Sequence, residues 1–117
     1  MTTAAIFGCA GLSLTDDERA FFSDVSPWGF ILFKRNVDTP KQVKALVAQL
    51  RETVGRDDAP ILIDQEGGRV QRLGPPHWRP YPKAADLAQL YDASPEDAER
   101  AVWLMSRLHA FDLLALG

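Results

Sequence analysis

Three short apolar runs, each followed by a stretch with helical periodicity, recur at intervals of roughly 30 residues and limit the folds open to this chain. The runs cover residues 4–8, 29–33 and 60–63. The middle run has no polar side chain at any position, which is typical of strands buried on both faces of a parallel sheet. The order strand, helix, strand, helix, strand, helix therefore predicts βαβ units in an α/β fold.

The helices that follow the runs have clear start signals. Thr15 and Glu18 have the spacing of a capping box, so the first helix is expected to begin at Thr15. Thr39 followed by Pro40 combines an N-cap with proline at the first helical position, and Gly55 is placed to end that helix. The buried stripe expected on this second helix consists of Val43, Leu46, Val47, Leu50 and Val54.

The second half of the chain begins with a proline-rich passage. Four prolines between residues 74 and 82 forbid a regular helix and predict an ordered loop. This loop also carries three aromatic rings, those of His77, Trp78 and Tyr81. A short helix is expected over residues 84–90, and Ser94 with Pro95 repeats the cap-then-proline signature of a long helix. The apolar face expected on that helix is formed by Ala101, Leu104, Met105, Leu108, Phe111 and Ala115.

Composition narrows the function classes. The 117 residues are 46% hydrophobic and 25% charged, as in average globular proteins. The net charge of -3 is too small and of the wrong sign for a nucleic-acid binder or a polybasic membrane anchor. No apolar run approaches the roughly 20 residues of a membrane helix, and the first residues lack the features of a secretory signal, so a cytoplasmic location is expected. The single cysteine, Cys9, is expected to be a small packed apolar residue.

The residues best suited to chemistry come directly after the third run. Asp64 stands at the carboxyl end of that run, where parallel sheets and barrels place their active sites. Gly67 and Gly68 would allow a ligand or another loop to approach closely. Arg69 and Arg72 supply donors for hydroxyls or a carboxylate. The same residues are compatible with a plain loop in which Asp64 caps a turn and the arginines are solvated.

Two strings in the chain resemble glycoside hydrolase family 3: Gly-Phe-Ile-Leu-Phe-Lys-Arg-Asn at residues 29–36 and Asp-Gln-Glu-Gly-Gly-Arg-Val-Gln-Arg at residues 64–72. Within that family, residues 7–117 are similar to the bacterial β-N-acetylhexosaminidases of cell-wall recycling. The resemblance implies a (β/α)8 barrel that removes terminal N-acetylglucosamine from muropeptides by a retaining, two-step mechanism without a cofactor. It also implies that Asp64 and Arg72 bind the sugar substrate.

The resemblance further implies that catalysis needs residues outside this chain. Such enzymes take their nucleophilic aspartate, their histidine acid/base and a Lys-His sugar-binding pair from segments after the third βα unit. No catalytic residue and no metal site are therefore expected within residues 1–117. We expect the chain to be the first three βα units of a TIM (β/α)8 barrel, incomplete here, with the barrel continuing beyond residue 117.

Two other interpretations remain open at this stage. A chain of 117 residues is long enough for a complete small α/β module that binds a ligand or partner without catalysis. Asp64 and Glu66 could alternatively hold Mg²⁺ through hard oxygen ligands, although two carboxylates alone are a weak signal. As the paired carboxylates of a glycosidase they are disfavoured, because neighbours on one strand end cannot flank opposite faces of a sugar.

The remaining candidate side chains have ordinary structural interpretations. His77 is expected to be packed within its proline-rich loop, and His109 is expected to pair with Asp112 on one helix face. Trp78 and Tyr81 either border a sugar site or only fill the loop. A three-stranded parallel sheet would leave strand edges and apolar faces uncovered, so the isolated chain is expected to be marginally stable and to self-associate.

Overall fold

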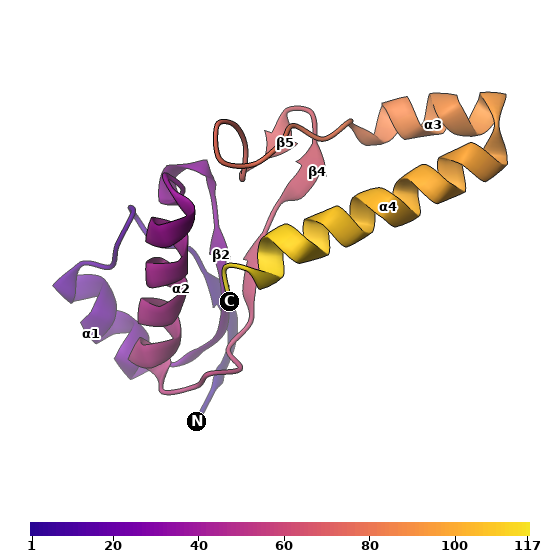
Figure 1. Ribbon diagram of the computed structural model, residues 1–117. Coiled ribbons are helices and arrows are strands. Elements are labelled where there is room, and N and C mark those ends of the chain that lie inside the picture. The colour runs from indigo at the N-terminus through magenta and orange to yellow at the C-terminus, as the bar shows by residue number, and fades with distance from the viewer. The chain divides into compact units, whose positions relative to one another are not determined.

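The computed structural model describes all 117 residues and divides into two compact units (Figure 1). The first unit comprises residues 1–63 together with residues 116–117, and the second comprises residues 64–115. A parallel sheet and two helices form the first unit, whereas the second contains a hairpin, an irregular loop and two helices. No helix is long and apolar enough to cross a membrane.

The first unit is organised by a three-stranded parallel sheet. Its strands are β1 (Thr3–Phe7), β2 (Pro27–Leu32) and β3 (Ile61–Ile63), in the order β1-β2-β3. Phe7 is opposite Phe30, and Leu32 is opposite Ile63. The three apolar runs are therefore strands, and the predicted parallel α/β arrangement is confirmed.

Helix α1 (Asp16–Val25) begins at the predicted cap. The Thr15 hydroxyl accepts a hydrogen bond from the Glu18 N–H at 3.2 Å, and a Glu18 carboxylate oxygen accepts one from the Thr15 N–H at 2.9 Å. The second Glu18 oxygen accepts from the Ala10 N–H at 2.7 Å. Partial burial opposes ionisation of Glu18, but these hydrogen bonds outweigh it and lower the pKa of its carboxyl.

Helix α2 (Pro40–Val54) also has the predicted ends. The Thr39 hydroxyl accepts from the Gln42 N–H at 3.2 Å, and Gly55 ends the helix in the left-handed conformation with φ of 62°. The buried side chains of α2 are Val43, Leu46, Val47 and Leu50. Helices α1 and α2 lie side by side (Figure 1), and Phe22 of α1 meets Phe30 of β2 edge-on, with ring centroids 5.1 Å apart.

Asn36 joins the segment that follows β1 to the segment that follows β2. It lies in the 3-10 helix η1 (Lys34–Asn36) and is completely buried. Its amide nitrogen donates to the carbonyls of Cys9 and Gly11 at 3.1 and 2.8 Å, and its amide oxygen accepts from the Phe33 N–H at 2.8 Å. Cys9 is 4% exposed, which confirms that it is packed, and burial raises the pKa of its thiol.

The second unit starts with a small antiparallel hairpin that the sequence analysis did not predict. Its strands are β4 (Gln65–Gly67) and β5 (Val70–Gln71). Residues 74–82 then form an irregular loop, as expected. Helix α3 (Ala84–Ala93) extends beyond the expected residue 90, and α4 (Pro95–Leu114) packs along it.

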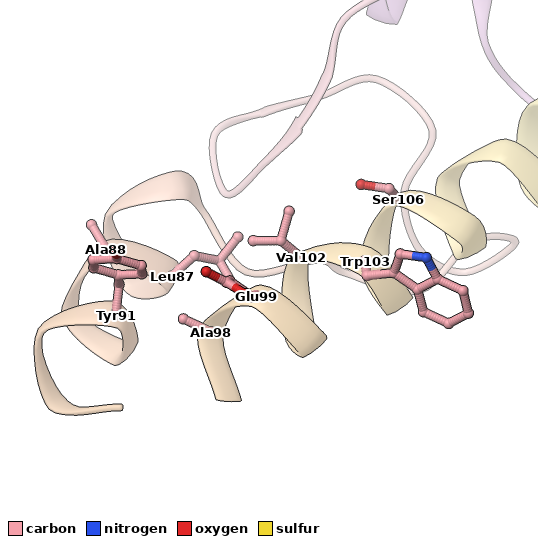
Figure 2. A pocket seen from close by; sticks show the side chains of 8 residues that line it. All are labelled: Leu87, Ala88, Tyr91, Ala98, Glu99, Val102, Trp103 and Ser106. Atoms are coloured by element: carbon pink, nitrogen blue, oxygen red, sulfur yellow. The ribbon is translucent and has the colours of Figure 1, made fainter. Parts of the chain in front are cut away.

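Much of the apolar face expected on α4 is exposed. Leu104 is 44% exposed, Leu108 42% and Phe111 73%. The reason is length, because α3 has 10 residues and α4 has 20, so α3 can cover only half of its partner. The two helices leave an open apolar groove of about 550 Å³, lined chiefly by Leu87, Tyr91, Val102 and Trp103 (Figure 2).

Candidate functional site

Asp64 and Arg72 are in direct contact. Asp64 comes immediately after β3, and the β4–β5 hairpin turns the chain back so that Arg72 lies beside it. The Arg72 Nη2 donates to Asp64 Oδ2 at 3.1 Å, and the Arg72 N–H donates to the Asp64 carbonyl at 3.2 Å. The structure therefore brings together the two residues singled out as substrate-binding candidates.

This ion pair is accessible to solvent. The Arg72 side chain is 26% exposed and the Asp64 side chain 39%. An ion pair in such contact with water contributes only about 0–1 kcal/mol to stability. A carboxylate has about four acceptor sites, so Asp64 can accept hydrogen bonds from ligand hydroxyls while it keeps its contact with Arg72. The pair thus offers an anionic acceptor and a cationic donor side by side, which suits a ligand with several hydroxyl groups.

The double glycine beside this pair makes room for another loop. Gly67 has φ of 85°, and a Cβ at this position would collide with the Pro82 carbonyl group. The Gly68 N–H donates to the Tyr81 carbonyl at 3.1 Å. Of the two close approaches expected here, ligand or loop, the structure shows the loop.

Gln71 fastens the same loop to the hairpin. Its amide nitrogen donates to the carbonyls of Leu73 and Arg79 at 2.7 and 2.9 Å, and its amide oxygen accepts from the Tyr81 N–H at 2.9 Å. Sequence reasoning missed this role. The sequence offered only one indication of this role, namely that Gln71 is a polar residue in a very short strand.

Two of the three aromatic side chains of the loop are buried within it. Trp78 is 8% exposed and Tyr81 is 7% exposed. His77 is exposed, with its ring edge-on to Trp78 at 5.9 Å between centroids. The expectation that His77 is packed is therefore wrong, because the loop buries the larger apolar ring of Trp78 and leaves the polar imidazole in water.

A second group of titratable side chains joins the loop to α4. The Tyr81 hydroxyl donates to Asp112 Oδ2 at 2.6 Å, and the rings of Tyr81 and His109 are perpendicular with centroids 4.1 Å apart. Burial, followed by the hydrogen bond and charge of Asp112, raises the pKa of Tyr81 to about 12. Burial lowers the pKa of His109, partly opposed by Asp112. Asp112 therefore acts on His109 through its charge, but its hydrogen bond goes to the loop.

The remaining candidates, Glu66 and Arg69, have exposed side chains. The structure contains no group of three or more His, Cys, Asp or Glu side chains that could hold a metal ion. A cation shared by Asp64 and Glu66 would also have to compete with the Arg72 guanidinium at 3.1 Å from the Asp64 carboxylate. This geometry disfavours the Mg²⁺ interpretation.

Comparisons with known proteins identify relatives of this chain. No protein-family model matches it. It is 40% identical over 112 residues to the β-hexosaminidase of Methylococcus capsulatus, a match that covers 96% of this chain and 32% of that protein. It is also 38% identical over 105 residues to the β-hexosaminidase of Stenotrophomonas maltophilia, covering 86% of this chain and 31% of that protein. The chain is related to the bacterial β-hexosaminidases.

Solved structures agree with this relationship. NagZ from Neisseria gonorrhoeae in complex with N-trifluoroacetyl-D-glucosamine matches with a TM-score of 0.86 and 33% identity, over 97% of this chain and 32% of that one. A glycoside hydrolase family 3 β-N-acetylglucosaminidase from a Paenibacillus species matches with a TM-score of 0.75 and 30% identity, over 95% and 20% of the two chains. The chain spans about a third of the length of the curated relatives it matches.

Proposed function

We propose that this chain is the N-terminal part of the catalytic barrel of a glycoside hydrolase family 3 β-N-acetylhexosaminidase. On this proposal, its three strands and their helices are the first βα units of a TIM (β/α)8 barrel. The parallel order β1-β2-β3 supports it, because barrel strands follow one another in chain order. The β-hexosaminidase relatives and the NagZ complex with a glucosamine derivative support a small carbohydrate as substrate.

The observation that carries the proposal is the contact between Asp64 and Arg72 at the carboxyl end of β3. Barrel enzymes build their active sites at this end of their strands. We assign Asp64 to accept hydrogen bonds from sugar hydroxyls and Arg72 to donate to the substrate. The full protein would remove terminal N-acetylglucosamine from muropeptides in peptidoglycan recycling, and a cytoplasmic location remains a prediction.

Substrate binding at this pair would promote catalysis by orientation. A retaining glycosidase needs a nucleophile on one side of the anomeric carbon and an acid/base near the leaving oxygen. Hydroxyl contacts hold the sugar in the geometry for attack, which lowers the entropic part of the barrier. On this proposal the nucleophile and the acid/base lie outside residues 1–117, so this chain alone hydrolyses nothing.

The test uses the full-length gene product and 4-nitrophenyl N-acetyl-β-D-glucosaminide. Asp64→Ala is expected to lower kcat/KM by roughly 10- to 100-fold, because the sugar loses an orienting contact. Asp24→Ala, which removes an exposed carboxylate from α1, serves as the matched control and should leave kcat/KM unchanged. Unchanged kinetics in Asp64→Ala, or turnover by the 117-residue chain alone, would contradict the proposal.

A further inference from the structure

Gln65 makes hydrogen bonds through both the oxygen and the nitrogen of its side-chain amide, inside the segment that forms the candidate site. Its amide oxygen accepts from the backbone N–H groups of Arg72 and Leu73, both at 3.1 Å. Its amide nitrogen donates to the Leu73 carbonyl at 2.9 Å. The side chain is half-buried, and neither the sequence motif nor the proposed sugar contacts account for these three bonds.

These bonds lie where the strand ladder stops. In the hairpin, Gly67 is opposite Val70 and Gln65 is opposite Gln71, and β5 ends at Gln71. Arg72 and Leu73 lie beyond the end of β5, and the Gln65 side chain accepts hydrogen bonds from both of their backbone N–H groups. The Arg72 N–H is thus held by both the Asp64 carbonyl, at 3.2 Å, and the Gln65 amide.

The ion pair cannot hold this geometry by itself. A solvent-accessible pair such as Asp64 and Arg72 contributes only about 0–1 kcal/mol, and arginine has many rotamers. A half-buried amide with three hydrogen bonds to backbone groups fixes a backbone more firmly than an exposed ion pair does. Gln65 and the Asp64 carbonyl therefore together fix the backbone that carries the Arg72 side chain.

We propose that Gln65 is a positioning residue that holds Arg72 against Asp64 for sugar binding. This inference rests on the proposed function of that pair. Gln65 does not need to touch the substrate, because it acts through the backbone of Arg72. Its loss should therefore impair sugar recognition more than the accompanying loss of stability explains.

Gln42 offers a matched control for the loss of stability. It is also half-buried and also makes three side-chain hydrogen bonds to the backbone, donating to the carbonyls of Leu12 and Asn36 at 2.8 Å and accepting from the Asp38 N–H at 2.8 Å. None of these bonds involves residues 64–73. Gln42→Met and Gln65→Met therefore remove the same number of hydrogen bonds by the same substitution.

The experiment compares these two variants with the wild type in the full-length gene product. Both should lose similar amounts of thermal stability. Gln65→Met should in addition lower kcat/KM for 4-nitrophenyl N-acetyl-β-D-glucosaminide by roughly tenfold, because a displaced Arg72 orients the sugar poorly, whereas Gln42→Met should not. Gln65→Glu should recover activity relative to wild type as the pH falls, because a protonated carboxyl can donate to the Leu73 carbonyl as the amide does.

Hydrogen–deuterium exchange provides a readout that does not depend on the substrate. The peptide containing Arg72 and Leu73 should exchange faster in Gln65→Met than in Gln42→Met. Equal exchange at this peptide, or equal kcat/KM in the two variants, would overturn the inference. If instead Asp64→Ala has wild-type kinetics, the proposed function fails, and the exchange result still decides whether Gln65 positions Arg72.

Discussion

Gly67 shows how a single residue determines whether the loop and the hairpin can pack together. Its φ of 85° is a conformation that L side chains rarely adopt, and the Pro82 carbonyl stands where a Cβ would be. The glycine therefore has a packing reason that does not involve a ligand. Pro82 belongs to the loop that Gln71 also binds. A side chain at position 67 would therefore push this loop away from the hairpin.

We expect Gly67→Ala to destabilise the chain by about 2–4 kcal/mol, since the added methyl group meets backbone strain and a carbonyl group together. Gly74→Ala is the matched control, because nothing lies within 4 Å of a Cβ built at that position. The free energy of unfolding in urea measures both effects. A loss in Gly67→Ala no larger than in Gly74→Ala would show that the loop can move away without penalty.

The two residues of the candidate site could be singled out from the sequence, but the contact between them could not be predicted. Asp64 follows an apolar run, and Arg72 completes a recognisable motif, so sequence alone singled them out. Their contact depends on a hairpin of three and two residues, too short for any periodicity to reveal. The partner of Tyr81 was equally hidden, because Asp112 is 31 residues away and its sequence neighbour His109 offered a nearer explanation.

Helix starts illustrate the same limit at the scale of elements. Thr39 and Ser94 precede prolines in the same way, and the sequence predicted a cap at each. The Thr39 hydroxyl accepts from the backbone N–H of Gln42, but the Ser94 hydroxyl donates to the exposed Asp97 carboxylate and caps no backbone group. One helix starts directly after another at Ser94, so its backbone follows α3 and not an independent cap geometry.

We therefore expect the two alanine substitutions to differ. Thr39→Ala should lower the free energy of unfolding by about 1 kcal/mol, because a backbone N–H at the start of α2 loses its partner. Ser94→Ala should have a smaller effect, since it removes only an exposed side-chain hydrogen bond. Urea unfolding followed by circular dichroism compares them, and equal losses would mean that Ser94 caps α4 in solution.

The hydrogen bond between Tyr81 of the loop and Asp112 of α4 makes the stability of the fold fall at alkaline pH. The pKa of Tyr81 is raised from 10.0 to about 12 in the folded chain. Above pH 10 the unfolded chain therefore loses this proton while the folded chain still keeps it. Stability from this group is complete below pH 10 and is lost as the pH rises towards 12.

Tyr81→Phe tests this link. It should cost about 1–2 kcal/mol at neutral pH, because Asp112 loses its hydrogen-bond donor, and it should flatten the fall in stability above pH 10. Tyr91→Phe is the matched control, since the Tyr91 side chain is 52% exposed and the variant should behave as wild type. Urea midpoints across this pH range give the answer, and parallel pH curves for Tyr81→Phe and wild type would contradict it.

At the scale of the whole molecule, several large apolar side chains are exposed to solvent. Trp103 is 59% exposed, Phe111 73% and Leu114 80%. In the sheet, β1 and β3 each have one neighbour only, and Ile6 and Leu62 are 46% and 38% exposed. Sequence periodicity identified the apolar stripe of α4 but not what covers it. The pattern shows which face of a helix is apolar, but not which element packs against that face.

These surfaces predict that the 117-residue protein self-associates. Unpaired strand edges and uncovered apolar helix faces are both satisfied by pairing with another copy. Size-exclusion chromatography with light scattering should show a mass that rises with protein concentration. The double variant Phe111→Ser and Leu114→Ser should shift the protein towards monomer, because it removes two of the most exposed apolar side chains of α4.

Glu52→Ser is the control for this measurement, since it changes an exposed polar residue of α2 and should leave the mass unchanged. Thermal unfolding adds a second criterion, because a chain that lacks part of its core should unfold over a broad temperature range. A clean monomer at every concentration with a sharp, cooperative transition would contradict the prediction. It would mean that the chain closes its own core, and it would favour a complete small binding module over part of a barrel.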